Sequence, residues 1–268
     1  MDGILNSLIK QPAEDKNLTM KKNIIYLFVL IALTLNISCD KTSDAKGNPG
    51  ISGRGGSLAR FTIAGNYLYM VDKSQLKVFN ISDPSSPELR STTNVGFEIE
   101  TIFPFKDKLF VGSTSVVHIF SIEDPELPKK LSTAISPQVM RRCDPVVARD
   151  SVAYATLRTN GICGGISSML VVYDIRDVLN PVQVNQLPVA EPYGLGYADN
   201  ALYVCDRSSL LVFDIADAYH PVWMKQLTDG DYYDVIPQGN TLVCWIKNGV
   251  ALYDITNRLD PQLITSIN

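Results

Sequence analysis

One sequence pattern recurs five times between residues 58 and 268. An apolar residue is followed by an aromatic residue, then by Asp, Asn or Ser, and then by Ile. A Pro stands at one fixed offset after each copy. A repeat of about forty residues is one supersecondary unit that cannot bury its apolar faces alone, so successive units must stack. The five copies occupy residues 78–81, 119–122, 172–175, 212–215 and 252–255, and the prolines are Pro87, Pro128, Pro181, Pro221 and Pro261.

Each repeat predicts four antiparallel strands. Residues 76–81 alternate and are rich in β-forming residues, and residues 67–72 and 60–64 predict two earlier strands. The Pro opens a fourth strand, which belongs at a sheet edge because Pro cannot donate to a strand ladder. The pattern therefore predicts an all-β fold, a β-propeller of five four-stranded blades of about forty residues each. A twisted β-sandwich and an open array are the alternatives, and the sequence does not show how a ring would close.

The repeats resemble the LVIVD-repeat family of secreted and lipid-anchored bacterial proteins. The likeness is carried by residues 203–206 and 211–215, which read YVCD and LVFDI, and next by residues 69–72 and 78–81. The resemblance covers residues 58–268 and implies a propeller. It implies no activity, because members of this family lack a well-defined common one.

Residues 1–39 read as a signal segment of the lipoprotein type. Lys21 and Lys22 precede a twelve-residue apolar run at 24–35, which is too short for the roughly 20 residues that span a bilayer. Ser38 and Cys39 then match the end of a bacterial lipoprotein signal, which predicts that Cys39 is acylated after cleavage. A plain signal peptide or an uncleaved anchor is the alternative. Met20 is expected to be the true start.

Residues 40–57 are polar and rich in Gly and Ser, so we expect a flexible tether between the lipid and the propeller at 58–268. The partners expected from this layout are the lipid bilayer, reached through acylated Cys39, and an unknown protein or glycan. The expected location is the cell envelope, as an outer-membrane lipoprotein on the periplasmic face or the cell surface. A net charge of −4 with no basic face predicts no nucleic-acid partner.

The cysteines fit an exported protein. Cys143 and Cys163 flank the first two strands of the third repeat, and a disulfide between them would hold the long loop of that repeat. Cys205 and Cys244 lie inside strands. We expect them to be small buried hydrophobes rather than a bridge, because their side chains should point to opposite faces.

No catalytic motif, cofactor motif or metal motif is present. Neither of the two histidines, His118 and His220, has a partner at ligand spacing, which disfavours a zinc site. Residues 228–234 hold three Asp and could bind a hard cation, although a solvated turn is the favoured interpretation. The sequence therefore predicts neither a cofactor nor a metal, and no enzyme.

Polar and aromatic residues are expected to converge where the loops entering each innermost strand meet the loops after each second strand. Such a propeller mouth is the default place for a ligand. The alternative is that each residue makes only local hydrogen bonds. The candidate ligand-binding residues are Glu98, Glu100, Arg141, Arg142, Asp144, Arg158, Glu191, Tyr193, Arg207, Asp231, Tyr232 and Asp234.

Three functions stay open at this stage. The first is a membrane-anchored binding or scaffold module for a protein or glycan. The second is an envelope enzyme acting on carbohydrate, with acid and base drawn from Glu98, Glu100, Glu191 and Asp231, which would need two carboxyl groups roughly 5–10 Å apart. The third is a subunit of a larger complex that docks through the outer strands.

Overall fold

The computed structural model describes residues 56–113, 116–135, 145–158 and 168–267. These residues form twenty strands and, within those ranges, no helix. The described residues accordingly include no helix able to cross a membrane. The strands of blades 1 and 2 are β1 (Phe61–Ala64), β2 (Tyr67–Asp72), β3 (Gln75–Asn80), β4 (Glu88–Asn94), β5 (Ile99–Phe105), β6 (Lys108–Ser113), β7 (Val116–Ser121) and β8 (Lys129–Ile135). Those of blades 3 to 5 are β9 (Val146–Arg149), β10 (Val152–Leu157), β11 (Ser168–Asp174), β12 (Val182–Val189), β13 (Leu195–Ala198), β14 (Ala201–Cys205), β15 (Leu210–Asp214), β16 (Val222–Leu227), β17 (Tyr232–Gln238), β18 (Thr241–Ile246), β19 (Gly249–Asp254) and β20 (Gln262–Ile267).

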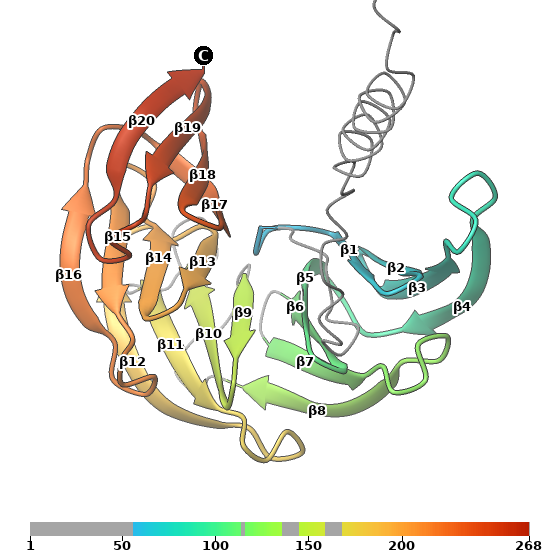
Figure 1. Cartoon of the computed structure of the whole chain (residues 1–268). Helices are drawn as coiled ribbons and strands as arrows, with labels where there is room; N and C mark the ends of the chain where they lie inside the picture. Colours follow the sequence, from blue (N-terminus) through green and yellow to red (C-terminus); the bar gives the residue numbers. More distant parts are fainter. Residues whose placement is uncertain (1–55, 114–115, 136–144, 159–167, 268) are drawn as a thin grey trace, which may run out of the picture. The chain divides into compact units, whose positions relative to one another are not determined.

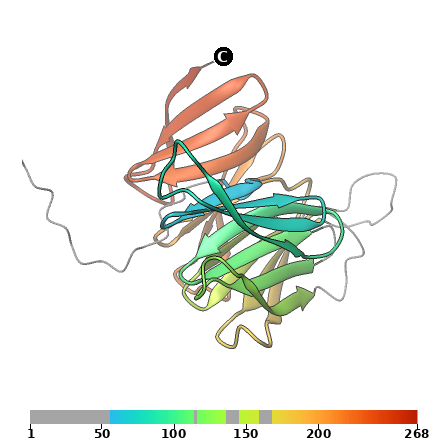
Figure 2. The same ribbon diagram turned by 90° about the vertical axis from the view of Figure 1, so that its right-hand side faces the viewer.

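The strands form five separate four-stranded antiparallel sheets, each in sequence order from the innermost to the outermost strand. The fold is the predicted five-blade β-propeller. Figure 1 shows the sheets following one another from β1–β4 to β17–β20, and Figure 2 looks onto blades 1 and 2 from the side. The strand that follows each motif Pro lies at a sheet edge in every blade, where its missing N–H costs no ladder hydrogen bond.

The repeated motif has the same structural role in all five blades. Its aromatic residue stands at a β-bulge opposite the outer strand, which increases the local twist. Its polar residue accepts a hydrogen bond from the backbone N–H two residues later, as Asp214 does from Ala216 (2.8 Å). The N–H of its Ile bonds back to the turn between the first two strands, as Ile215 does to Asn200 (2.7 Å). The motif therefore encodes the corner of a blade.

Successive blades pack face to face through four hydrophobic clusters, which we call seams. One seam joins each successive pair, from blades 1 and 2 to blades 4 and 5. Strands in the middle blades are buried on both faces, as in β10 and β14, where every residue is buried. Such strands behave like those of a sheet covered on both sides.

Tyrosine hydroxyl groups add a polar contact to three of the seams. Tyr69, Tyr154 and Tyr203 occupy one repeat position, and each hydroxyl donates to a backbone carbonyl of the next blade. The acceptors are the carbonyl groups of Pro125 (2.9 Å), Ala218 (2.8 Å) and Arg258 (2.8 Å). Blade 2 has Phe110 at this position, and there Ser132 donates to the carbonyl of Val178 instead.

No hydrophobic cluster of the described residues joins blade 5 to blade 1. The strands of these end blades alternate between buried and accessible residues, as in β2, β18 and β19, instead of being buried on both faces. Among the described residues, the first blade is therefore joined to the last two by the N-terminal residues of the propeller and not by a fifth seam.

Candidate functional site

The segment Gly56–Ala59, here called the leading segment, connects the first blade to the last two. Ser57 Oγ donates to Asp234 Oδ1 (3.2 Å), and the Leu58 N–H donates to Asp234 Oδ2 (3.2 Å). The Leu195 N–H in turn donates to Ser57 Oγ (2.7 Å). Asp234 on β17 and Leu195 on β13 belong to blades 5 and 4, so a few polar contacts take the place of an apolar seam.

Asp234, one of the predicted ligand residues, is thus occupied by the chain itself. Burial raises the pKa of its carboxyl group to about 6, and the hydrogen bonds from the leading segment and from the Val235 N–H only partly offset this. A carboxylate that is removed from water and accepts local donors is a structural group here rather than an open ligand contact.

The raised pKa predicts how stability depends on pH. Because the folded-state pKa of about 6 lies above the ordinary value of 3.8, the folded protein holds more protons between these values. Asp234 therefore stabilises the fold most below about pH 4, and this contribution falls as the pH rises through 6, by up to about 3 kcal/mol. Asp234→Asn should remove that slope in urea unfolding measured at a series of pH values.

His118 also contributes to the pH dependence of stability, with the opposite sign. Burial lowers the pKa of His118 from 6.5 to about 4, so its contribution is present above pH 6.5 and is lost as the pH falls through 4. The difference between the wild type and Asp234→Asn isolates the carboxyl group. Identical pH profiles for the two proteins would show that Asp234 has an ordinary pKa.

Four side chains at the mouth form what we call the aromatic shelf: Arg158, Tyr193, Tyr233 and Trp245. The Arg158 guanidinium lies over the Tyr193 ring, 4.2 Å from its centroid. The Tyr193 and Tyr233 rings meet edge to face at 5.4 Å, and Tyr233 meets Trp245 at 5.2 Å. The shelf spans blades 3, 4 and 5, and 56% of Trp245 is exposed.

A charged rim borders the shelf. Arg207 Nη1 lies 2.8 Å from both carboxylate oxygens of Glu191, and the Asp206 carboxylate accepts the backbone N–H groups of Ala190 and Glu191. Arg207 has a φ of 46°, in the left-handed region, and its carbonyl accepts the Tyr232 N–H of blade 5. The turn that carries Arg207 therefore holds blades 4 and 5 together at the mouth.

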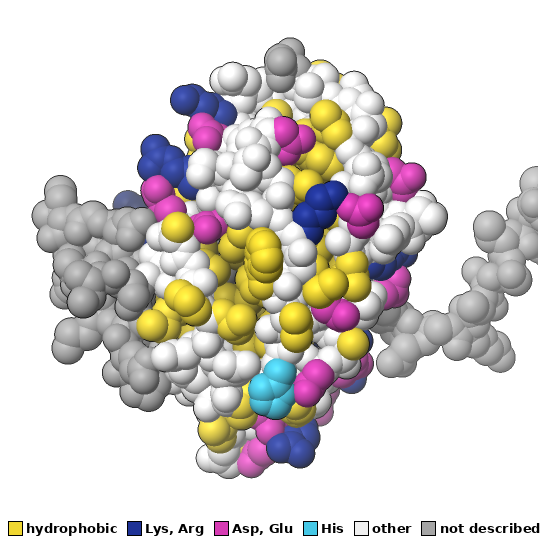
Figure 3. All heavy atoms as spheres, turned by 90° about the vertical axis from the view of Figure 1, so that its left-hand side faces the viewer, with side chains coloured by type: hydrophobic (Ala, Val, Ile, Leu, Met, Phe, Trp, Pro, Cys, Tyr) yellow, Lys and Arg dark blue, Asp and Glu magenta, His cyan; other side chains and the backbone are white. Residues whose placement is uncertain are grey.

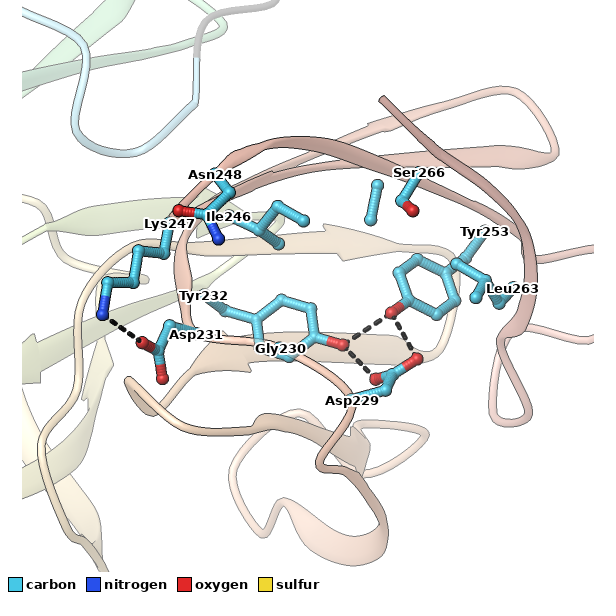
Figure 4. Close-up of a pocket in the computed structure, with 11 residues that line it drawn as sticks. Asp229, Gly230, Asp231, Tyr232, Ile246, Lys247, Asn248, Tyr253, Leu263 and Ser266 are labelled. Carbon is cyan, nitrogen blue, oxygen red and sulfur yellow. Dashed lines mark hydrogen bonds and ion pairs between the residues drawn. The ribbon is translucent and has the colours of Figure 1, made fainter. Parts of the chain in front are cut away.

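Next to the rim, blade 5 has a pocket of about 320 Å³ (Figure 4). The Asp229 carboxylate accepts the hydroxyl groups of Tyr232 and Tyr253, and these two hydroxyls lie 2.6 Å apart. Burial, followed by these hydrogen bonds, raises the pKa of Tyr232, and burial also raises the pKa of Tyr253. Both hydroxyl groups are therefore neutral hydrogen-bond donors. Lys247 Nζ lies 3.9 Å from Asp231 at the pocket edge.

The sequence candidates thus divide into groups. Arg158, Glu191, Tyr193 and Arg207 are brought together, with Asp231 and Tyr232 beside them at the pocket. Glu98 and Glu100 belong to blade 2, at the start of β5, where Glu98 is exposed with a φ of 54°. Arg141, Arg142 and Asp144, the proposed disulfide partners Cys143 and Cys163, and the acylation site Cys39 lie outside the described residues.

The acidic loop holds no metal cluster among the described residues. Its three carboxylates have different partners: Asp229 accepts two tyrosine hydroxyls, Asp231 pairs with Lys247, and Asp234 binds the leading segment. The carboxylates of the enzyme hypothesis come from three different blades: Glu98 and Glu100 from blade 2, Glu191 from blade 4 and Asp231 from blade 5. The enzyme hypothesis stays a prediction.

Cys205 and Cys244 are buried and free, as expected. The reason given from the sequence was wrong, however. The two side chains do point to opposite faces of their own blades, but these faces meet, so both thiols lie in the seam between blades 4 and 5. They fill space there as small apolar groups.

A second exposed apolar surface covers the outer strands. Figure 3 faces blades 4 and 5 from outside and shows hydrophobic side chains gathered over its middle. The exposed large apolar residues on the outer strands β12, β16 and β20 are Val182, Val184, Val222, Trp223, Met224, Leu263, Ile264 and Ile267. An exposed apolar surface of this kind marks a candidate contact for another protein.

The comparison with known families concerns blade 1. A family model described as the LVIVD repeat matches residues 55–95, which contain all four strands of that blade. Blade 1 is an LVIVD repeat. The other four blades repeat its motif geometry, bulge and corner hydrogen bonds. No curated protein matches the chain.

Solved structures share the fold at low sequence identity. The periplasmic gluconolactonase PpgL of Pseudomonas aeruginosa is 14% identical over 76% of this chain and 67% of that one, with a TM-score of 0.58. A chain of a nidogen/laminin complex is 14% identical over 76% of each chain, with a TM-score of 0.53. BamB from Moraxella catarrhalis is 10% identical over 78% of this chain and 62% of that one, with a TM-score of 0.53. These similarities show the fold alone.

Proposed function

We propose that this chain is an exported lipoprotein, held at a membrane by acylated Cys39, whose propeller binds a protein partner at the aromatic shelf. The observation that carries the binding part is the composition and exposure of the shelf. Trp, Tyr and Arg are the residues most enriched where protein interfaces concentrate their binding energy. Here they are stacked on one another, and Trp245 is 56% exposed.

The rim adds charged side chains to the aromatic shelf. The Glu191–Arg207 pair and the Asp231–Lys247 pair place charges of both signs beside the rings. Exposed charges at the edge of an interface add little affinity, but they orient a partner and increase its association rate. One chain of a nidogen/laminin complex has a similar fold, which supports a protein as the class of ligand.

The anchoring part rests on the sequence up to Cys39 and is tested separately. In fractionated cells the wild-type chain should pellet with membranes, and Cys39→Ala should move most of it to the soluble fraction. Several acyl chains are needed for stable anchoring, so losing the attachment site should abolish it. A Cys39→Ala chain that still pellets would show that the apolar run at 24–35 is the anchor.

The shelf is tested by photo-crosslinking in cells that express the full chain. A photoreactive phenylalanine analogue at position 245 should capture a distinct protein. Arg158→Ala should reduce that capture about tenfold, since truncating a residue central to an interface costs 1–2 kcal/mol or more. Capture should be detected by immunoblotting, and the bound protein identified by mass spectrometry.

Trp223 provides a matched control. It is 57% exposed, like Trp245, but lies on outer strand β16. Equal capture at both positions, unaffected by Arg158→Ala, would contradict a partner at the shelf and favour docking through the outer strands. Binding of a purified glycan to the wild type, lost in Arg158→Ala, would replace the protein with a carbohydrate as the ligand.

A further inference from the structure

The two end blades each expose one face of the kind that is buried elsewhere in the propeller. On blade 5 this face carries Val243, Val250 and Leu252, with Ile267 from the outer strand β20. None of these residues is buried, and Ile267 is 62% exposed. Trp245 lies at the mouth end of the same face. A contiguous apolar sheet face that is left accessible to solvent indicates a contact.

Blade 1 exposes its opposite face. Paired residues on its four strands place Phe61, Leu68, Met70, Phe79 and Leu89 on one side of the sheet. Phe61 is 59% exposed and Leu89 is 57% exposed, whereas the other face of blade 1 is buried against blade 2. The two exposed faces thus belong to the two ends of the same series of blades.

The residues at equivalent positions of other blades show what each exposed face would contact. In the register of the motif, Val243, Val250 and Leu252 correspond to Tyr203, Leu210 and Val212 of blade 4, which pack against the next blade. The exposed residues Leu68, Met70 and Phe79 of blade 1 correspond to Leu202, Val204 and Phe213 of blade 4, which pack against the preceding blade. The exposed pair of faces is therefore the same pair that meets in all four internal seams.

We infer that a second copy of this chain docks here, with its blade 1 packed on blade 5 of the first copy. A second copy is the partner that carries both halves of the seam, and the contact continues an interface that the chain already makes four times. The inference does not rest on the proposed function, although Trp245 belongs both to this face and to the aromatic shelf.

Two substitutions make this contact weaker than an internal seam. Val243 stands where three other blades have a hydrogen-bonding Tyr, and Lys77 of blade 1 stands where blade 4 has the buried Leu211. The association should therefore be reversible. It is also heterologous, since different surfaces of the two copies meet, so it produces a closed ring or a longer chain of copies.

The test uses two full-length chains with different tags, expressed in the same cells. One carries Phe79→Cys, the other carries Leu252→Cys, and the cells are treated with a short bismaleimide. We expect a crosslinked species that contains both tags. The control pair, Phe79→Cys with Gln226→Cys on β16, should give no more of it than chains with only their native cysteines. A signal no higher than this background would overturn the inference.

A chain with both Phe79→Cys and Leu252→Cys distinguishes closure within one molecule. A crosslink confined to monomers would show that blades 1 and 5 of one chain meet, which also overturns the inference. Sedimentation of the purified full chain in detergent gives an independent measure. The wild type should dissociate from dimers or larger species on dilution, and Leu252→Asp should be monomeric while its unfolding midpoint stays close to that of the wild type.

Discussion

Replacing Tyr203 with Ala should lower the free energy of unfolding by about 3–5 kcal/mol, the cost of removing a large buried aromatic side chain. Tyr203 is fully buried in the seam between blades 4 and 5, and its hydroxyl donates to the Arg258 carbonyl (2.8 Å). Truncation leaves a cavity and an unpaired carbonyl group at once. Urea unfolding followed by circular dichroism measures the loss.

Two further variants separate the causes. Tyr203→Phe keeps the ring and should cost only about 1 kcal/mol, the value of one buried hydrogen bond. Val243→Ala changes the equivalent position of blade 5 and should cost less than about 1 kcal/mol, because that face is not covered within the chain. These measurements need dilute protein. Losses of several kcal/mol at both positions would show that the blade 5 face is buried even in a monomer.

The fold could be predicted because its signals are local. The motif polar residue and the Asx residue three positions later each bond a backbone N–H two residues on, and the Pro needs an edge strand in every blade. These requirements involve neighbours in sequence, so they leave the same pattern five times. In the last repeat, too, the strand predicted to follow the motif Pro is present, as β20.

It could not be predicted in this way that no seam of the described residues joins blade 5 to blade 1. It depends on how far the series of blades curves, which is the sum of many small rotations between packed sheets. One signal was present nonetheless. The position held by Tyr69, Phe110, Tyr154 and Tyr203 is aromatic in the first four repeats, whereas the fifth repeat has Val243. The loss of this aromatic residue marks the blade whose outward face is not covered by the described residues of the chain.

The candidate site was predicted only in part, again for a physical reason. Glu191, Tyr193 and Arg207 could be placed at the mouth because their loops enter or leave known strands. Tyr233 and Trp245 were missed. A bulge between Tyr232 and Asp234 leaves Tyr233 without a partner on β18, and its ring contacts both Tyr193 and Trp245. A bulge changes which way a side chain points without leaving a clear sequence mark.

We expect Gly56→Ala to destabilise the fold by about 1–3 kcal/mol, the usual cost of overpacking. A Cβ at residue 56 would lie 2.0 Å from Asp234 Oδ2 and 2.6 Å from its Cγ. The carboxylate would have to turn away, and it would then lose its hydrogen bonds to Ser57 and Leu58. Thermal unfolding of the full chain measures this loss.

Asp234→Ala tests the cause, since it removes the three atoms nearest to the new methyl group. In a double-mutant cycle the two substitutions should couple by about 1 kcal/mol or more, because each alone breaks the same contact. Gly65→Ala is the matched control, because a Cβ there would meet nothing within 4 Å. It should destabilise the fold only through the φ of 58° at this position. This loss of stability should add to that of Asp234→Ala. If Gly56→Ala and Asp234→Ala also prove additive, the leading segment does not rest on Asp234, and a different contact must hold the first blade to the last two.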